Sequence, residues 1–260
     1  MRTLFIGDVV GKPGREGLAA AMPSLREEHK PDLVIVNGEN AGGGVGITSE
    51  TAAEIFDAGA DVITLGNHTY RHREVYGYLD SEKRIVRPAN FPAANPGRGH
   101  TSVDAAGMRV AVVNLSGQLH LTVERSPFPV AEEILAELDG KADAVIVDFH
   151  AELTSEKVAM GWHLDGRVAA VLGTHTHVPT ADARVLPGGT AHMTDVGMTG
   201  SRSGIIGVKR EQALQAFRTQ MPIRFETAEE DIWVMGVVVD ISDDGLARGI
   251  TPVSLPVADL

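Results

Sequence analysis

Two histidines separated by a single residue are the most distinctive chemical feature of the sequence. His175 and His177 belong to a Gly-Thr-His-Thr-His segment that begins at Gly173, directly after an apolar run. Both imidazoles can reach one centre if the backbone turns there, and in a straight strand they would share a face. On its own, such a pair fits a polar turn with solvent-facing histidines equally well.

Polar side chains occur at four comparable positions. Asp8, Glu39, Asn67 and His150 each follow a short apolar run. A single Asp or Asn after a strand is more often a turn former than a ligand, but recurrence after five runs favours one shared site. Carboxylate, amide and imidazole ligands together suit iron, manganese or zinc, whereas an all-oxygen set would suit magnesium or calcium. The pattern therefore predicts a transition-metal site.

The composition excludes several other kinds of chemistry. The chain of 260 residues has no cysteine, so disulfides, thiolate zinc sites and cysteine nucleophiles are ruled out. The formal net charge of -12 argues against long nucleic acids as partners, because such binding needs Lys and Arg to neutralise phosphates. Metal-binding carboxylates enter this count without the ions that offset them, so the site itself can be locally positive.

Length and hydrophobicity define the expected organisation. A hydrophobic content of 43% supports a sizeable core, and we predict a single domain over residues 1–260. The apolar run before Asp8 is far too short for a signal peptide, and no segment approaches ~18 uninterrupted apolar residues. We therefore expect a soluble cytoplasmic protein without membrane association. The oligomeric state stays open, and a homo-oligomer is compatible with the sequence.

The elements that must position these side chains follow from the spacing of apolar residues. Short apolar runs predict buried strands at residues 4–6, 33–36, 62–65, 110–113, 144–149 and 168–172. Helical patterns cover residues 15–28 with a break near Pro23, 48–58, 130–138, 155–160 and 209–219, with Thr48 and Ser155 as N-caps. Residues 233–241 and 249–255 predict a closing hairpin, and residues 88–107 and 116–129 predict irregular connections. Alternating strands and helices indicate an α/β fold, in which ligands gather at the carboxyl ends of strands.

In this order the segments resemble the calcineurin-like metallophosphoesterases. The pattern of that family runs Gly-Asp-x-His, Gly-Asp, Gly-Asn-His, a lone His and Gly-His-x-His. The corresponding segments begin at Gly7, Gly38, Gly66, Phe149 and Gly173. Two positions depart from the pattern: Val10 replaces the first histidine, and Glu39 replaces the aspartate that usually bridges the metals.

These departures, together with residues 148–157 and 193–200, make the chain similar to the YmdB-type bacterial branch of that superfamily. The resemblance implies a layered α/β/β/α metallophosphoesterase sandwich with the metal site at the strand carboxyl ends. It also implies phosphodiesterase activity on small phosphoesters, notably 2',3'-cyclic nucleotides. Two transition-metal ions are expected, with iron preferred over manganese or zinc.

The same resemblance assigns ligands residue by residue. One ion would be bound by Asp8, Glu39, Asn40 and His177, and the other by Glu39, Asn67, His150 and His175. Glu39 would bridge the ions, and the side-chain oxygen of Asn40 would fill the place that Val10 leaves without an imidazole. The alternative for Asn40 is a purely structural role in shaping the turn.

A mechanism follows from this arrangement. Two cations roughly 3.5 to 4 Å apart can share a water, lower its pKa so that hydroxide is available at neutral pH, and clamp the phosphoryl oxygens during in-line attack. His68, adjacent to Asn67, is the predicted general acid that protonates the leaving oxygen. The alternative is that His68 only orients the ligands.

Two further functions are compatible with the sequence. One is a different dinuclear hydrolase, either a phosphomonoesterase or a nuclease of short RNA, that uses the same ions. The other is a regulatory nucleotide-binding protein with little turnover, an interpretation that the missing imidazole at Val10 favours.

Overall fold

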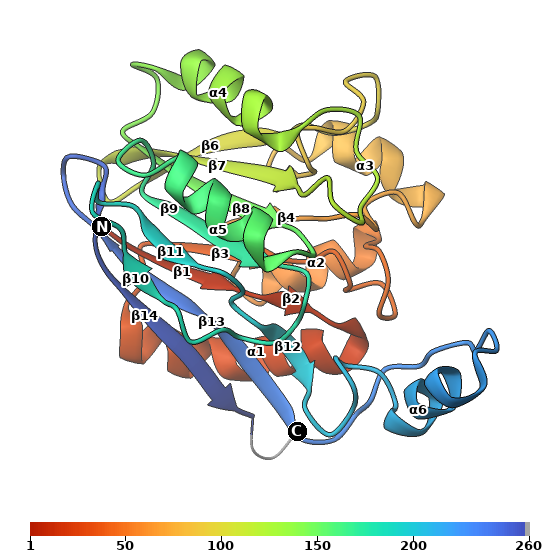
Figure 1. Ribbon diagram of the computed structural model, residues 1–260. Helices are drawn as coiled ribbons and strands as arrows, with labels where there is room; N and C mark the ends of the chain where they lie inside the picture. Colours follow the sequence, from red (N-terminus) through yellow and green to blue (C-terminus); the bar gives the residue numbers. More distant parts are fainter. Residues whose placement is uncertain (258–260) are drawn as a thin grey trace.

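The computed structural model describes residues 1–257. In this part of the chain, two β-sheets are stacked face to face, with helices on both outer sides (Figure 1). The helices are α1 (Gly11–His29), α2 (Ser49–Asp57), α3 (Tyr76–Ser81), α4 (Pro127–Leu138), α5 (Thr154–His163) and α6 (Arg210–Thr219), and a 3-10 turn, η1 (Arg73–Val75), precedes α3. None of the helices within residues 1–257 combines the length and the apolar character needed to span a membrane.

The strands are divided between two sheets. The first has eight, in the order β2 (Asp8–Val9), β12 (Met198–Ser201), β13 (Ile232–Ile241), β1 (Arg2–Ile6), β3 (Leu33–Asn37), β4 (Val62–Thr64) and β5 (Ile85–Val86), with β14 (Ala247–Pro256) paired to β13. The second has six, in the order β10 (Arg184–Val185), β11 (Ala191–Met193), β9 (Ala170–Thr174), β8 (Ala144–His150), β7 (Met108–Ser116) and β6 (His100–Ala105).

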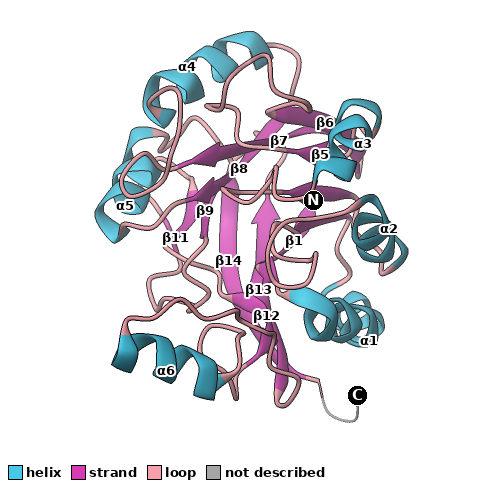
Figure 2. Cartoon of the chain, turned by 90° about the vertical axis from the view of Figure 1, so that its right-hand side faces the viewer, coloured by secondary structure: helices cyan, strands magenta, loops and turns pink. Residues whose placement is uncertain are grey.

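Strands that are apolar on both faces explain the layering. In β1, Leu4 and Ile6 pack with the residues of α1 and α2, while Phe5 belongs to the core between the sheets. In β8, Ile146 faces the core between the sheets and Val147 packs with α4 and α5. The result is the predicted α/β/β/α sandwich, in which each sheet is covered on both faces (Figure 2).

Parallel pairing brings the ends of several strands to one edge. β1, β3 and β4 are parallel neighbours in the first sheet. β7, β8 and β9 are parallel neighbours in the second. The carboxyl ends of each set therefore lie on the same edge, and the residues that follow those ends can meet.

Most predicted elements are present, although their ends differ by a few residues. All six predicted inner strands occur, and the predicted hairpin forms as β13 and β14. Thr48 is the N-cap of α2, and its side chain and that of Thr51 bond each other's backbone N–H.

Three details of the prediction were wrong. α1 continues through Pro23 without a break, because Pro23 lies on the solvent side, where the carbonyl that it leaves unbonded can meet water. Ser155 lies inside α5, whose N-cap is Leu153. Residues 88–107 are not wholly irregular, since they contain β6, which pairs antiparallel with β7.

Candidate metal centre

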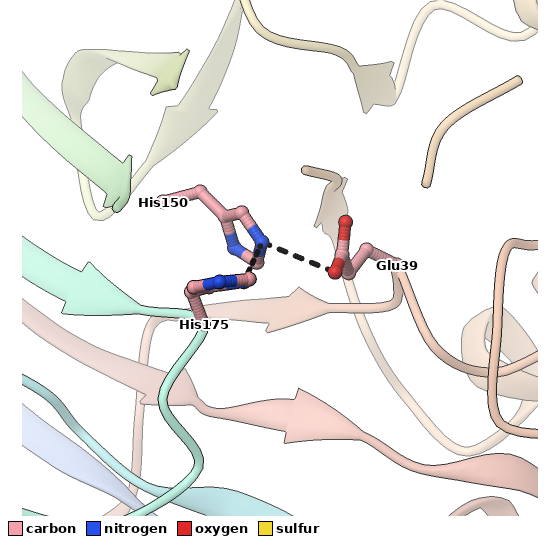
Figure 3. Close-up of side chains that lie close together, drawn as sticks. All are labelled: Glu39, His150 and His175. Atoms are coloured by element: carbon pink, nitrogen blue, oxygen red, sulfur yellow. Dashed lines mark hydrogen bonds and ion pairs between the residues drawn. The ribbon is translucent and has the colours of Figure 1, made fainter. Parts of the chain in front are cut away.

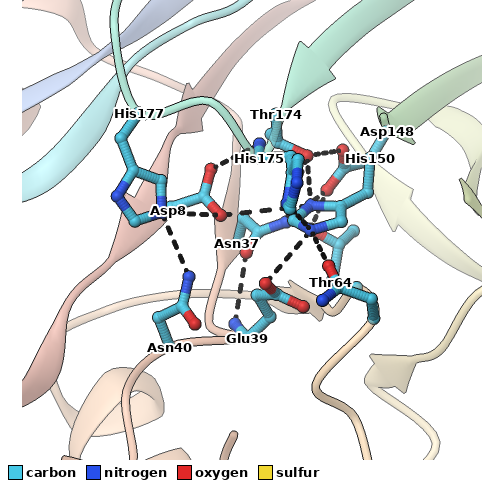
Figure 4. Close-up of polar contacts among 12 residues, drawn as sticks. Asp8, Asn37, Glu39, Asn40, Thr64, Asp148, His150, Thr174, His175 and His177 are labelled. Carbon is cyan, nitrogen blue, oxygen red and sulfur yellow. Dashed lines mark hydrogen bonds and ion pairs between the residues drawn. The ribbon is translucent and has the colours of Figure 1, made fainter. Parts of the chain in front are cut away.

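The side chains predicted as metal ligands meet where the strand ends of the two sheets converge (Figure 4). They are Asp8 after β1, Glu39 and Asn40 after β3, Asn67 after β4, His150 at the end of β8, and His175 and His177 after β9. The fold therefore brings together every residue of the predicted ligand set.

His150 is the centre of one group of donor atoms (Figure 3). Its Nε2 lies 3.1 Å from Glu39 Oε1, 3.0 Å from Asn67 Oδ1 and 3.1 Å from His175 Nδ1. Donor atoms of Glu39, His150 and His175 all lie within 4.8 Å of one another, a spacing that a single metal ion can occupy. Glu39, Asn67, His150 and His175 are the predicted ligands of the second ion.

The other group surrounds His177. Its Nε2 lies 3.1 Å from Asn40 Nδ2 and 3.7 Å from Asp8 Oδ1. The Asn40 amide turns its nitrogen toward His177, while its oxygen lies 3.1 Å from Nδ1 of His68. A ligand role for that oxygen beside His177 requires a half-turn of the amide, which exchanges two groups of nearly equal shape.

The turn that carries both C-terminal histidines has an unusual backbone. His175 and His177 have φ values of 101° and 68°, a region that residues other than glycine seldom occupy, although histidine enters it more often than most. Between them, the backbone N–H and the hydroxyl of Thr176 both donate to Asp195 Oδ2, at 3.1 and 2.7 Å. Lys157 donates to the same oxygen at 2.7 Å, and both members of this ion pair are 1% exposed. The buried pair therefore fixes the middle of the turn.

A buried carboxylate also supports His150. Thr174 Oγ1 lies 2.8 Å from His150 Nδ1 and donates to Asp148 Oδ1 at 2.7 Å. Because the hydroxyl donates to Asp148, it accepts from Nδ1–H of His150, which leaves Nε2 free as a metal donor. This role of Asp148 was not predicted. The signal was its position two residues before His150 on the same face of one strand.

The charges of the cluster are poorly balanced by protein groups alone. Asp8 and Glu39 are fully buried, and among the described residues only histidines lie within ion-pair distance of them. Asp8 Oδ1 is buried without a hydrogen-bond partner in this part of the chain. Burial of carboxylates without a cation is costly, so these atoms fit a centre that binds metal ions.

Burial and mutual contacts set the protonation of the cluster. Burial raises the pKa of Asp8. For Glu39, burial acts in the same direction, but His150 and His68 outweigh it and hold the pKa well below its usual range. For His150, burial acts to lower the pKa, yet the carboxylate of Glu39 raises it to about 9. Burial, aided by the charge of His150, lowers the pKa of His175 to about 3. Without metal, a proton on His150 is thus the main counter-charge of Glu39.

A pocket of about 320 Å³ opens beside the cluster. Glu39, Asn40, His68, His175 and His177 form its polar part. The His68 backbone N–H donates to Glu39 Oε2 at 3.0 Å, and the His68 side chain is 37% exposed. His68 is therefore next to the candidate ligands and accessible to a bound molecule.

Known proteins with similar sequences identify the family of this chain. A family model described as "YmdB-like protein" matches residues 4–253. The chain belongs to the YmdB-like family. A relative from Bacillus subtilis (strain 168), named 2',3'-cyclic-nucleotide 2'-phosphodiesterase, is 49% identical over 243 residues, which cover 94% of this chain and 92% of that protein.

Two solved structures are similar over nearly the whole chain. One, a hypothetical protein from Thermus thermophilus, has a TM-score of 0.93 at 41% identity, and the match covers 98% of this chain and 99% of that one. The other, a novel phosphatase from Mycoplasma pneumoniae, has a TM-score of 0.92 at 33% identity, with 98% and 93% covered. The YmdB-type resemblance and the layered fold are therefore confirmed.

Packing explains the valine at position 10 of this YmdB-like chain. Val10 is 2% exposed, and its side chain lies against Gly200 and Gly207. It also lines the pocket beside the cluster. Where the wider superfamily pattern has an imidazole, this chain has part of an apolar wall.

Proposed function

We propose that the chain is a dinuclear metal-dependent phosphodiesterase that hydrolyses small phosphoesters, with 2',3'-cyclic nucleotides as its substrates. The observation that carries this proposal is the convergence of nitrogen and oxygen donors in two groups at the strand ends. The names of the B. subtilis relative and of the M. pneumoniae structure support the same class of reaction.

The two donor groups fit two ions. Asp8, Glu39, Asn40 and His177 would hold one ion, and Glu39, Asn67, His150 and His175 the other, with Glu39 as the bridge. When bound, such a pair supplies a water of lowered pKa and positive charge beside the phosphoryl oxygens. Three imidazoles in the set favour transition metals, and we place iron ahead of manganese and zinc.

His68 would act on the leaving group. Its Nδ1 lies 3.1 Å from Glu39 Oε1, so the cluster holds this nitrogen. Nε2 has no hydrogen-bond partner within residues 1–257, and the side chain lines the pocket. As water adds to phosphorus and one P–O bond of the cyclic ester breaks, Nε2 would give its proton to the departing ribose oxygen.

A panel of substrates tests the proposal, with protein loaded with iron or manganese. We expect 2',3'-cyclic nucleotides to be hydrolysed faster than phosphomonoesters, bis-nitrophenyl phosphate and short oligoribonucleotides. Glu39→Gln keeps the size of the bridging residue but removes its charge, so it should abolish turnover and metal binding together. Glu27→Gln, at an exposed position of α1, is the matched control and should change neither.

Each alternative function has its own outcome in this experiment. Faster hydrolysis of monoesters or oligoribonucleotides would replace the proposed substrate. Nucleotide binding without turnover would favour a regulatory protein, the alternative that Val10 supports. Wild-type activity in Glu39→Gln would overturn the dinuclear centre.

A further inference from the structure

The segment that carries α6 leaves the body of the molecule and returns to it (Figure 1, Figure 2). We call residues 205–228, which lie between β12 and β13, the α6 arm. The two ends of the arm pair with each other: the Lys209 N–H donates to Glu226 O and the Ala228 N–H to Gly207 O, both at 2.9 Å. The arm is thus a loop with a closed base.

Two phenylalanines of the α6 arm are exposed beside the candidate metal centre. Phe217 is 76% exposed and Phe225 is 49% exposed. Burial of an aromatic side chain is favourable because it removes apolar surface from water, and apolar side chains that cluster on a surface often mark a binding site. Both line the pocket that also contains Glu39 and His68. The aromatic surface is therefore continuous with the metal centre.

A hydrogen bond fixes the α6 arm to the cluster. Nδ1 of His177 donates to Ile206 O at 2.8 Å, which leaves Nε2 of His177 for a metal ion. Gly207, next in the arm, lies against Val10. The fold therefore sets how far the aromatic side chains lie from the donor atoms. Such a fixed distance suits a site that holds two parts of one molecule.

We propose that Phe217 and Phe225 form the subsite for the base of a nucleotide whose phosphate lies at the metal centre. This inference rests on the proposed phosphodiesterase function. Among the described residues, the pocket wall beyond the metal ligands and His68 consists of glycine and apolar side chains. The two phenylalanines offer stacking, and no side chain of this wall offers a hydrogen bond to the edge of a base, so purines and pyrimidines are both accepted.

Kinetics with and without a base test the subsite. Phe217→Ala and Phe225→Ala are compared with wild type on 2',3'-cyclic nucleotides of all four bases and on glycerol 1,2-cyclic phosphate, which lacks a base. We expect kcat/KM for each cyclic nucleotide to fall ~10-fold in either variant, mainly through KM, and that for the base-free ester to change less than ~2-fold. Leu214→Ala is the matched control, because Leu214 is 47% exposed on the same helix but does not line the pocket.

An equal loss with both kinds of substrate, or no loss with either, would overturn the subsite. Unchanged kinetics with an altered molar mass of Phe217→Ala in solution would also overturn it, since the α6 arm would then be a contact between copies of the chain.

If wild type hydrolyses neither substrate, the phosphodiesterase proposal fails separately. In that case, calorimetry measures the binding of a nucleoside 3'-monophosphate and of glycerol phosphate to wild type and to Phe217→Ala. The subsite proposal requires that the substitution weakens binding of the nucleotide and leaves binding of glycerol phosphate unchanged.

Discussion

His68 lies where ligand orientation and proton transfer can be separated by experiment. Its Nδ1 contacts Glu39 and Asn40, while its side chain is open to the pocket. Removal of a residue that only orients ligands should weaken metal binding. Removal of a general acid should instead slow the reaction of substrates whose leaving group needs a proton.

His68→Ala is expected to keep its metal ions and to lower kcat for cyclic nucleotides by about 10²- to 10⁴-fold, the usual contribution of a positioned acid. The loss should be much smaller for bis-nitrophenyl phosphate, because nitrophenolate leaves without a proton. Metal content and both rates are measured on one preparation. Wild-type turnover of cyclic nucleotides would remove the acid role, and loss of metal would assign His68 to orientation.

At the scale of elements, the buried pair of Lys157 in α5 and Asp195 after β11 positions the histidine turn. Lys157→Met leaves Asp195 as an unpaired buried charge and should lower the free energy of unfolding by about 3–5 kcal/mol. Lys157→Met/Asp195→Leu removes both charges and should recover part of that stability, since Thr176 and Gly197 also lose their acceptor. In the double variant Thr176 has lost its acceptor, so metal affinity should be about 10- to 100-fold weaker than in wild type.

Urea unfolding and metal titration of these two variants separate stability from positioning. If the double variant binds metal as tightly as wild type, the pair is only structural. Asp139→Asn, at an exposed position after α4, is a control that should change neither stability nor metal affinity.

Some features of the candidate site could be predicted from the sequence, and others depend on the fold. Asp8 and His150 were predictable as residues of the candidate site because each follows a short apolar run, and parallel strands bring such positions to one edge. The partnership of Lys157 and Asp195 was not predictable, since 38 residues separate them and only the fold joins them. The apolar pattern of α6 indicated a helix, but the position of Phe217 depends on backbone pairing at the base of the arm.

His192 in β11 makes stability depend on pH. It is 1% exposed, its Nδ1 donates to Val171 O at 3.1 Å, and its Nε2 is buried without a partner in the described chain. Burial lowers its pKa, so below the ordinary value of 6.5 the unfolded chain binds a proton that the folded chain resists. Its contribution is therefore complete above pH 6.5 and is lost as the pH falls below that value.

His192→Gln should reduce the loss of stability between pH 6.5 and pH 5, because the titrating group is gone. Urea unfolding across this range measures the slope for the variant and for wild type. Parallel slopes would show that other groups cause the acid sensitivity.

At the scale of the whole molecule, the candidate centre joins the two sheets. Asp8, Glu39 and Asn67 follow strands of the first sheet, whereas His150 and His175 come from strands of the second. Metal ions held by both sets would connect the layers at this edge. Metal binding should therefore stabilise the folded chain as a whole.

Removal of the metal is expected to lower Tm by about 5–10 °C. A ligand at 100 times its Kd contributes about 2.7 kcal/mol, and domains of this size shift by about 2–4 °C per kcal/mol. The stabilisation should grow from about pH 6.5 to pH 8.5. Binding displaces the proton of His150, whose pKa burial acts to lower but Glu39 raises to about 9. Calorimetry with and without chelator measures the shift. A shift that shrinks with rising pH, or one that persists in Glu39→Gln, would contradict metal binding across the two layers.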